Sequence, residues 1–216
     1  MQMLALALVL AQAAAPPAQE PAQEPAPKAA PSGPFVALDV AQGRTSFGTI
    51  TVALDAEKAP VTVKNFLSYV RSGHYDGTVF HRVMGNFMIQ GGGFTPELEE
   101  KPTQAPIRNE ARNGPRNSRG TVAMARTTDP HSATSQFFIT HKANHMLDFG
   151  IGGAGYAVFG EVVEGMDVVE RIAAVPTTSR GQHQNVPMMA VVIRKAREVK
   201  APAPPAAPKA TEPAKP

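Results

Sequence analysis

Apolar and polar residues alternate in a series of short segments between residues 35 and 199. Alternation sends successive side chains to opposite faces, which is typical of β-strands with one buried face. The pattern predicts strands over residues 35–40, 48–54, 78–83, 87–91, 120–125, 136–140, 157–162 and 188–199. Gln42-Gly43-Arg44 has the composition of a turn that joins the first two strands into a hairpin.

Two segments carry helical spacing instead. The first opens with Pro60, places apolar residues at positions 63, 66, 67 and 70, and ends at Gly73. The second covers residues 165–174, whereas the polar segment 95–119 has little periodicity and is expected to be loop. Seven or eight short strands that do not alternate regularly with helices predict a mainly β protein, in which an antiparallel sheet closes into a barrel.

Composition divides the chain into one domain and its flanking segments. Residues 16–34 and 200–216 are rich in proline and alanine, so we expect disordered linkers on either side of a domain at 35–199. Residues 1–15 form an apolar run that is too short to span a bilayer and resembles a secretory signal peptide. Because this segment ends in the small residues Ala11-Gln12-Ala13 and Ala13-Ala14-Ala15, which fit a cleavage site, we predict export, for example to the periplasm. The alternative is an uncleaved N-terminal helix on a cytoplasmic protein, since no Lys or Arg precedes the run.

Charge and cysteine content narrow the possible functions. The net charge is only +3, which gives no indication of a nucleic-acid partner. The chain contains no cysteine, which excludes disulfides, thiolate nucleophiles and sulfur-ligated metals.

Residues 80–94 carry the most informative local pattern: two strand-like runs, a Gly85-Asn86 turn and three successive glycines. Strand alternation separates Arg82 from its two neighbours, and it places Met88 and Gln90 on a common face. We therefore expect one guanidinium, one amide and large apolar side chains on one surface. Such a mixture suits a ligand that is apolar but carries amide carbonyls, and a peptide has this character.

Residues 135–140 show a similar alternation between two faces of a strand. Phe137 and Ile139 fall on one face of the predicted strand, and Gln136 and Phe138 fall on the other. Both phenylalanines could belong to the core. Gln136 is awkward in a core, however, and it favours a second contribution to the same binding surface.

Several separated blocks together resemble the cyclophilin peptidyl-prolyl isomerases, in order and in spacing. The blocks are Phe80-His81-Arg82-Val83, Phe87-Met88-Ile89-Gln90-Gly91-Gly92, Gly120-Thr121-Val122-Ala123-Met124-Ala125-Arg126, Ser135-Gln136-Phe137-Phe138-Ile139 and Val158-Phe159-Gly160-Glu161-Val162. The resemblance covers residues 35–199 and is nearest to the bacterial branch of the family. It implies a closed antiparallel eight-stranded β-barrel capped by two α-helices.

The resemblance also implies roles for individual residues. It places the catalytic arginine on Arg82, with His81, Phe87 and Gln90 as the other catalytic positions. The remaining substrate-binding positions fall on Met88, Ala125, Arg126, Gln136, Phe138, Met146, Leu147 and Tyr156. Many eukaryotic cyclophilins have tryptophan at position 146, where its indole N–H supports cyclosporin binding. Methionine donates no hydrogen bond, so we expect weak inhibition by cyclosporin.

The implied reaction is the rotation of Xaa-Pro peptide bonds in proline-containing polypeptides during protein folding, by a monomer that needs no cofactor or metal. A guanidinium that donates a hydrogen bond to the prolyl nitrogen favours the twisted, non-conjugated amide. His81 could be interpreted as a general base, but rotation transfers no proton permanently. Packing at the pocket wall is therefore the preferred role for His81.

Other functions remain open at this stage. The same surface could serve a proline-binding module or a holdase chaperone without significant turnover. A hydrolase would need a nucleophile, but Ser135 lies in no nucleophile-elbow pattern. His141 and His145 have a spacing that could ligate zinc, and the triple glycine lacks the residues of a phosphate loop. Arg108, Arg112, Arg116 and Arg119 could contact nucleic acid, although a solvated loop is the simpler interpretation.

Overall fold

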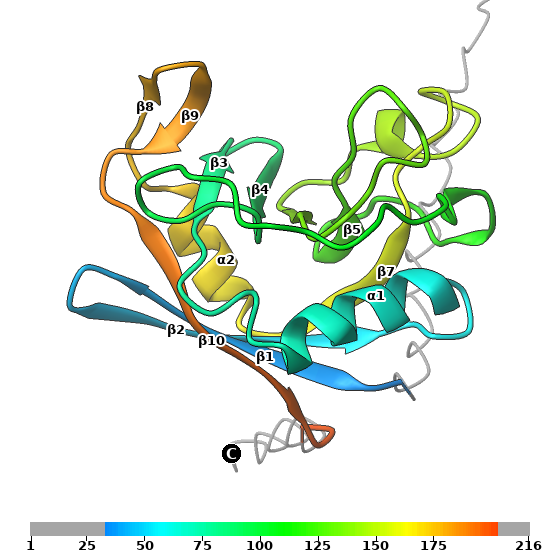
Figure 1. Ribbon diagram of the computed structural model, residues 1–216, viewed down its shortest axis with the longest axis horizontal. Coiled ribbons are helices and arrows are strands. Elements are labelled where there is room, and N and C mark those ends of the chain that lie inside the picture. Colours follow the sequence, from blue (N-terminus) through cyan, green and yellow to red (C-terminus); the bar gives the residue numbers. More distant parts are fainter. Residues whose placement is uncertain (1–32, 203–216) are drawn as a thin grey trace, which may run out of the picture. The chain divides into compact units, whose positions relative to one another are not determined.

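A computed structural model describes residues 33–202 of the chain. Eight strands form one sheet, and every neighbouring pair in it is antiparallel (Figure 1). The predicted signal segment 1–15 and most of the predicted linkers lie outside the described residues. Only residues 33–34 and 200–202 of those linkers are described.

The order of the strands in this sheet is β10-β1-β2-β7-β5-β6-β4-β3. Their bounds are β1 Phe35–Gln42, β2 Thr45–Leu54, β3 Phe80–Val83, β4 Met88–Gly91, β5 Thr121–Met124, β6 Phe137–Thr140, β7 Val158–Glu164 and β10 Val191–Val199. A single bridge between Val79 and Val192 joins the two outer strands. Beside it, the Ile193 amide donates to the Thr78 carbonyl at 2.8 Å, so the sheet is a nearly closed barrel.

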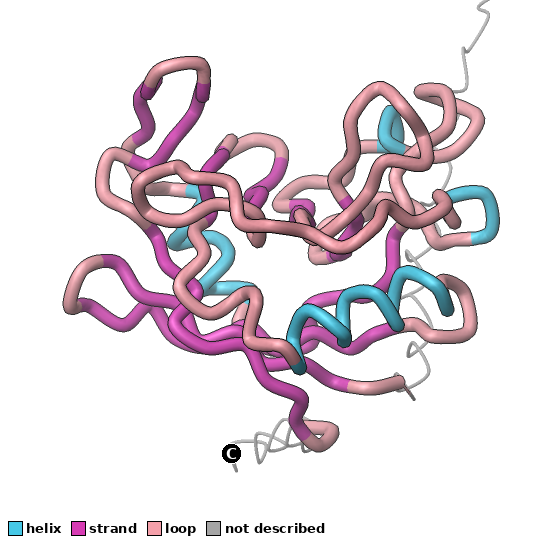
Figure 2. The backbone as a smooth tube through the Cα atoms, viewed as in Figure 1, coloured by secondary structure: helices cyan, strands magenta, loops and turns pink. Residues whose placement is uncertain are grey.

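Two α-helices complete the fold, α1 at Pro60–Arg71 and α2 at Met166–Ala173. Both bury apolar residues in the same core as the sheet. Short 3-10 helices occur at Ala111–Asn113 and His145–Leu147 (Figure 2). The mainly β barrel with two helices that the sequence predicted is therefore confirmed. Within residues 33–202, no helix has the length and apolar character needed to cross a membrane.

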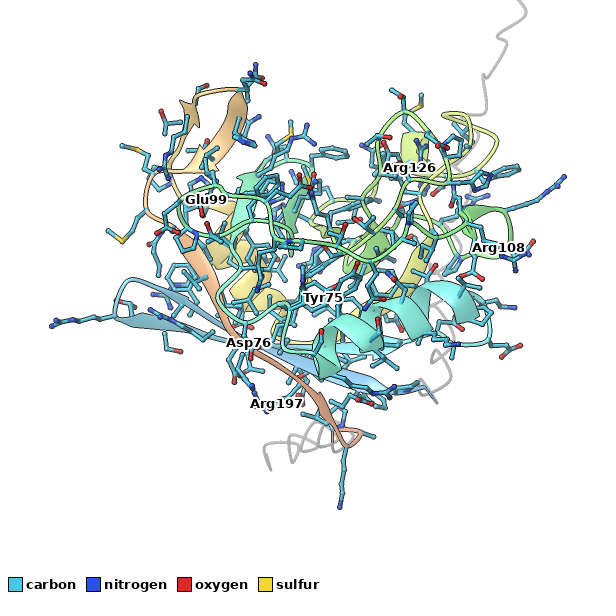
Figure 3. All side chains as sticks on the ribbon, in the orientation of Figure 1. Tyr75, Asp76, Glu99, Arg108, Arg126 and Arg197 are labelled. Atoms are coloured by element: carbon cyan, nitrogen blue, oxygen red, sulfur yellow. The ribbon has the colours of Figure 1, made fainter. Side chains whose placement is uncertain are left out.

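Aromatic rings fill the barrel beneath β6. Phe66 of α1 lies 5.1 Å from Tyr75, 5.5 Å from Phe137 and 5.0 Å from Phe159, measured between ring centroids. Tyr75 is fully buried, and its hydroxyl donates to the Ser135 carbonyl at 2.8 Å (Figure 3). Because Tyr75 binds the backbone of Ser135, two residues before β6 begins, the core fixes the position of that strand.

The N-terminus of α1 is held by a residue far away in the sequence. Ala59 stands at the N-cap position, and no side chain there accepts from the helix. Instead, the carboxylate of Glu110 accepts hydrogen bonds from the backbone of Val61 at 3.2 Å and of Thr62 at 2.8 Å. The Thr62 hydroxyl donates to it as well, also at 2.8 Å. The long loop 95–119 thus contributes a buried capping group, which its polar composition did not indicate.

One element was not predicted. Strands β8 (Thr177–Arg180) and β9 (His183–Pro187) pair with each other in a separate two-stranded sheet, drawn in orange in Figure 1. All four residues of β8 are exposed, so no alternation of apolar and polar residues marks this strand. The available signal was the two-residue turn Gly181-Gln182, in which Gly181 has φ +57°.

We predict that Glu110→Ala lowers the free energy of unfolding by about 2–4 kcal/mol, because it leaves buried donors of α1 unpaired and removes a negative charge from the helix N-terminus. Glu110→Gln should lie between Glu110→Ala and wild type. Glu97 is exposed in the same loop, and Glu97→Ala should change stability by less than about 0.5 kcal/mol. Urea denaturation measures all three variants. Equal stability of the alanine variants would show that Glu110 is not an important cap.

Candidate functional site

A row of paired residues crosses four strands on the outer face of the barrel. Arg82 of β3 pairs with Gln90 of β4, and Gln90 pairs with Phe138 of β6. Phe138 then pairs with Ala123 of β5. Because directly paired residues of neighbouring strands point to the same side of a sheet, the guanidinium, the amide and the aromatic ring share one face. This is the convergence that the sequence predicted.

A β-bulge sets the direction of Arg82. Phe80 pairs with Gly91 and Arg82 pairs with Gln90, so β3 has one extra residue here, His81. As a result, Phe80 and Val83 both reach the core, although they are three positions apart. Simple alternation predicted correctly that Arg82 and Val83 face opposite sides, but it did not predict the bulge.

Apolar side chains form a second cluster on this outer face, separate from the barrel core. Its buried members are Met88, Ala123, Phe138 and Val158, and the partly buried residues packed against them are Met84, Phe87, Ala125, Leu147 and Tyr156. Phe138 and Tyr156 meet edge to face, with 5.6 Å between ring centroids. The structure therefore brings together Phe87, Met88, Phe138 and Leu147, the residues at which the resemblance places the proline pocket.

Two amides lie between this cluster and Arg82. Gln90 Nε2 donates to Gln136 Oε1 at 3.0 Å, which orients both side chains. The glycines that follow β4 make room for Gln136 and for two rings of the core. A Cβ atom at Gly93 would lie only 2.5 Å from Gln136 Cγ, and one at Gly92, where φ is +86°, would collide with the Tyr75 and Phe137 rings. The glycines therefore allow a close approach of the backbone to Gln136 and to the core rings.

Arg126 borders the cluster beyond β5 (Figure 3). Its guanidinium lies over the Tyr156 ring, 4.3 Å from the centroid, and its Nε donates to the Gly155 carbonyl at 3.0 Å. Tyr156 is thus held between Arg126 and Phe138. The cation–π contact fixes the ring at the edge of the apolar surface.

Asp148 anchors the loop that carries Met146 and Leu147. Its carboxylate accepts from the Asn117 backbone at 2.7 Å and from the Asn117 side chain at 3.0 Å, and it lies 3.1 Å from His145 Nδ1. Burial alone would raise the pKa of Asp148, but the hydrogen bonds from Asn117 and His145 lower it below its usual value. Met146 itself is 63% exposed, so it lies at the rim and outside the cluster. Sequence reasoning missed Asp148, because its partner is distant in the chain.

His81 lies beside the site in a buried position. Its ring is tilted against the Phe94 ring, with 4.6 Å between the centroids, and 6% of the residue is exposed. Burial, followed by the nearby His183 and Arg82, lowers the pKa of His81 to about 4. The imidazole is therefore neutral at pH 7, and its Nδ1 is buried without a hydrogen-bond partner in the described structure. These surroundings fit a packing role better than a basic one.

Arg82 is partly buried. Within the described residues, its guanidinium forms no salt bridge and no hydrogen bond to a protein group. Other arginines around the barrel are engaged, such as Arg119 with Glu170 and Arg71 with Glu198. The donors of Arg82 are therefore available to a ligand at the edge of the apolar cluster.

The surroundings of Ser135, His145 and Arg112 do not favour a hydrolase, a metal site or a nucleic-acid site. Ser135 is completely buried, which makes it inaccessible as a nucleophile. His145 pairs with Asp148, and residues 33–202 contain no group of three or more potential ligands placed to hold a metal ion. Arg112 lies over the Phe149 ring, 5.6 Å from its centroid.

Comparison with known proteins identifies the family. Residues 38–198 match the family model described as "Cyclophilin type peptidyl-prolyl cis-trans isomerase/CLD". The chain is 60% identical over 156 residues to a peptidyl-prolyl cis-trans isomerase of Streptomyces antibioticus, covering 71% of this chain and 94% of the relative. It is 55% identical over 152 residues to peptidyl-prolyl cis-trans isomerase B of Escherichia coli, covering 69% of this chain and 93% of the relative.

A solved structure supports the fold. The crystal structure of a cyclophilin-type isomerase of Cryptosporidium parvum superposes with a TM-score of 0.66 at 24% sequence identity, and the match covers 78% of this chain and 99% of that one. At this identity the likeness bears on the fold alone. Together with the family model and the bacterial relatives, the barrel and its outer face lead to one conclusion. The chain belongs to the cyclophilin-type peptidyl-prolyl cis-trans isomerases.

Proposed function

We propose that this chain accelerates the rotation of Xaa-Pro peptide bonds, with Arg82 as the group that acts on the prolyl amide. One observation carries the assignment: an arginine that forms no ion pair within residues 33–202 lies in register with Gln90 and Phe138, at the edge of a separate apolar cluster. The apolar cluster would hold the proline ring, and Gln90 and Gln136 would bind the substrate backbone. The bacterial relatives are named as isomerases, which supports the same activity here.

The chemistry requires that amide conjugation be weakened. Delocalisation of the nitrogen lone pair creates a barrier of about 18–20 kcal/mol to rotation, and the lone pair becomes localised in the twisted transition state. A hydrogen bond from Arg82 to that nitrogen is therefore stronger in the transition state than in the planar ground state. The apolar cluster meanwhile fixes the ring, so that the acyl side of the bond turns.

Arg82 supplies part of the rate enhancement. A hydrogen bond to a charged group contributes about 1.5–3 kcal/mol net, or roughly ten- to a hundredfold in rate. Orientation of the peptide and exclusion of water must supply the remainder. A lysine offers a charge without the planar fork of donors, so it should replace Arg82 poorly.

The alternative is a proline-binding module or holdase that uses the same surface without turnover. Such a module needs the apolar cluster and the two glutamines, but it gains little from an unpaired guanidinium beside them. A partly buried cation without a partner carries a desolvation cost, which is recovered when it binds a developing lone pair. The state of Arg82 therefore favours catalysis.

We predict that Arg82→Ala lowers kcat/KM about ten- to a hundredfold for a peptide with one Xaa-Pro bond, and that Arg82→Lys restores little of it. Arg44→Ala is the matched control, because Arg44 is exposed in the β1–β2 turn, on another part of the barrel. Exchange NMR spectroscopy measures both turnover and peptide binding. Equal rates for wild type and Arg82→Ala would reject the assignment, whereas binding without turnover in both proteins would favour the binding module.

His81 provides a pH test of the packing role. Its folded pKa of about 4 lies below the ordinary value of 6.5, so the unfolded chain binds this proton more readily than the folded chain between these pH values. The stabilising contribution of neutral His81 should therefore be fully present above pH 6.5. The free energy of unfolding should fall by up to about 3 kcal/mol as the pH drops to 4.

We predict that His81→Gln flattens this pH dependence and loses less turnover than Arg82→Ala, because rotation transfers no proton. NMR titration of the imidazole and urea denaturation between pH 4 and pH 8, together with peptide turnover, check the two parts. A measured pKa near 6.5, or a loss of activity equal to that of Arg82→Ala, would contradict the packing role.

We further propose that the protein acts on exported polypeptides as they fold. Support comes from the apolar run within residues 1–15 and the small residues that follow it. Deleting residues 1–15 should retain the protein in the cytoplasm of a bacterial host and leave peptide turnover of the purified domain unchanged. Cell fractionation measures this outcome, and a full-length protein found only in the cytoplasm would overturn the proposal.

A further inference from the structure

A cleft opens beside Arg82, away from the apolar cluster. Its volume is about 300 Å³, and the residues that line it come from β3 and from the tip of the β8–β9 hairpin: His81, Arg82, Gln182, His183, Gln184 and Asn185. Arg82 thus lies between two surfaces of different character, one apolar and one rich in amides. Sequence reasoning placed no function on this hairpin.

Ring contacts hold the hairpin against β3. The Phe94 ring is tilted against the His81 ring, with 4.6 Å between centroids, and it meets the His183 ring edge to face at 5.2 Å. Val186 of β9 is buried at 3% exposure, and Arg180 of β8 donates to the Pro96 carbonyl at 3.4 Å. A two-stranded hairpin is only marginally stable by itself, so these contacts are needed to position it over the cleft.

The hairpin wall is polar but carries no acidic or permanently charged side chain in the cleft. Gln182 and Gln184 are exposed, and Asn185 is partly buried. A carboxamide can both donate and accept hydrogen bonds, so this wall matches the N–H and C=O groups of an extended polypeptide. An apolar side chain would find no complementary surface there.

Spacing connects this cleft to the row of site residues. The row from Ala123 to Arg82 crosses four adjacent strands, and three intervals of about 4.8 Å give a span of roughly 14 Å. An extended peptide covers about 3.3 Å per residue, so about four residues cross the row and the next ones reach the hairpin.

We infer that the β8–β9 hairpin is a further wall of the substrate groove, which binds the main chain of the residues that leave the proline site past Arg82. This inference rests on the proposed isomerase function and extends it. The protein would then recognise a polypeptide segment longer than the Xaa-Pro unit, with Gln182 and Gln184 as the residues that favour longer substrates.

The experiment uses three peptides. The short peptide has one residue on either side of Xaa-Pro, the second adds Ser-Gly-Ser at its N-terminus, and the third adds Ser-Gly-Ser at its C-terminus. The proteins are wild type, the double variant Gln182→Ala/Gln184→Ala, and Thr178→Ala, which alters an exposed residue of the same hairpin outside the cleft. Exchange NMR spectroscopy gives kcat/KM for each combination of protein and peptide. Thermal unfolding confirms that the variants, altered only at exposed side chains, remain folded.

We expect the double variant to lower kcat/KM about three- to tenfold per lost hydrogen bond for one of the two extended peptides, with no change for the short peptide. Thr178→Ala should leave all three substrates unchanged. Equal losses for short and extended peptides, or no loss for either extended peptide, would overturn the inference. Failure of the wild type to turn over even the short peptide would instead reject the proposed function on which the inference rests.

Discussion

The site depends on one constraint: β6 is fixed by an aromatic core on one face, so its other face is determined as well. Phe137 packs against Phe66 and Tyr75 inside the barrel, and the Tyr75 hydroxyl binds the chain just before the strand. A shift of one residue would exchange the two faces of β6 and expose Phe137. The core therefore specifies that Phe138 and Gln136 face outward, and Gly92 makes this possible because a side chain there would collide with the rings.

Much of this arrangement was predictable from the sequence, because alternation and helical spacing report directly on burial. The β1–β2 hairpin, both α-helices and the opposite directions of Phe137 and Phe138 followed from such patterns. The family resemblance then indicated the eight-stranded barrel and the site residues. These predictions succeeded where the two sides of an element have different surroundings, as for Phe137 in the core and Phe138 in the outer cluster.

The features that escaped prediction depend on contacts between distant segments or lack a buried face. Glu110 caps α1 from a loop nearly fifty positions away, and Asp148 reaches back to Asn117. The bulge at His81 is a property of the pairing between β3 and β4, which the β3 sequence alone does not encode. The β8–β9 hairpin has an entirely exposed first strand, so no periodicity could reveal it.

The surroundings of Arg82 connect these features to chemistry. The bulge turns Arg82 outward while its neighbours Phe80 and Val83 remain in the core, and it sends His81 toward Phe94. His81 is neutral there, so it does not add a second positive charge that would repel the guanidinium. Phe94 in turn contacts His183 of the β8–β9 hairpin. The bulge thus has two effects. It turns the Arg82 guanidinium outward, and it places His81 against Phe94, which contacts the hairpin that lines the polar cleft. This arrangement is a physical reason why the proposed catalysis and the proposed preference for longer substrates would be coupled at Arg82.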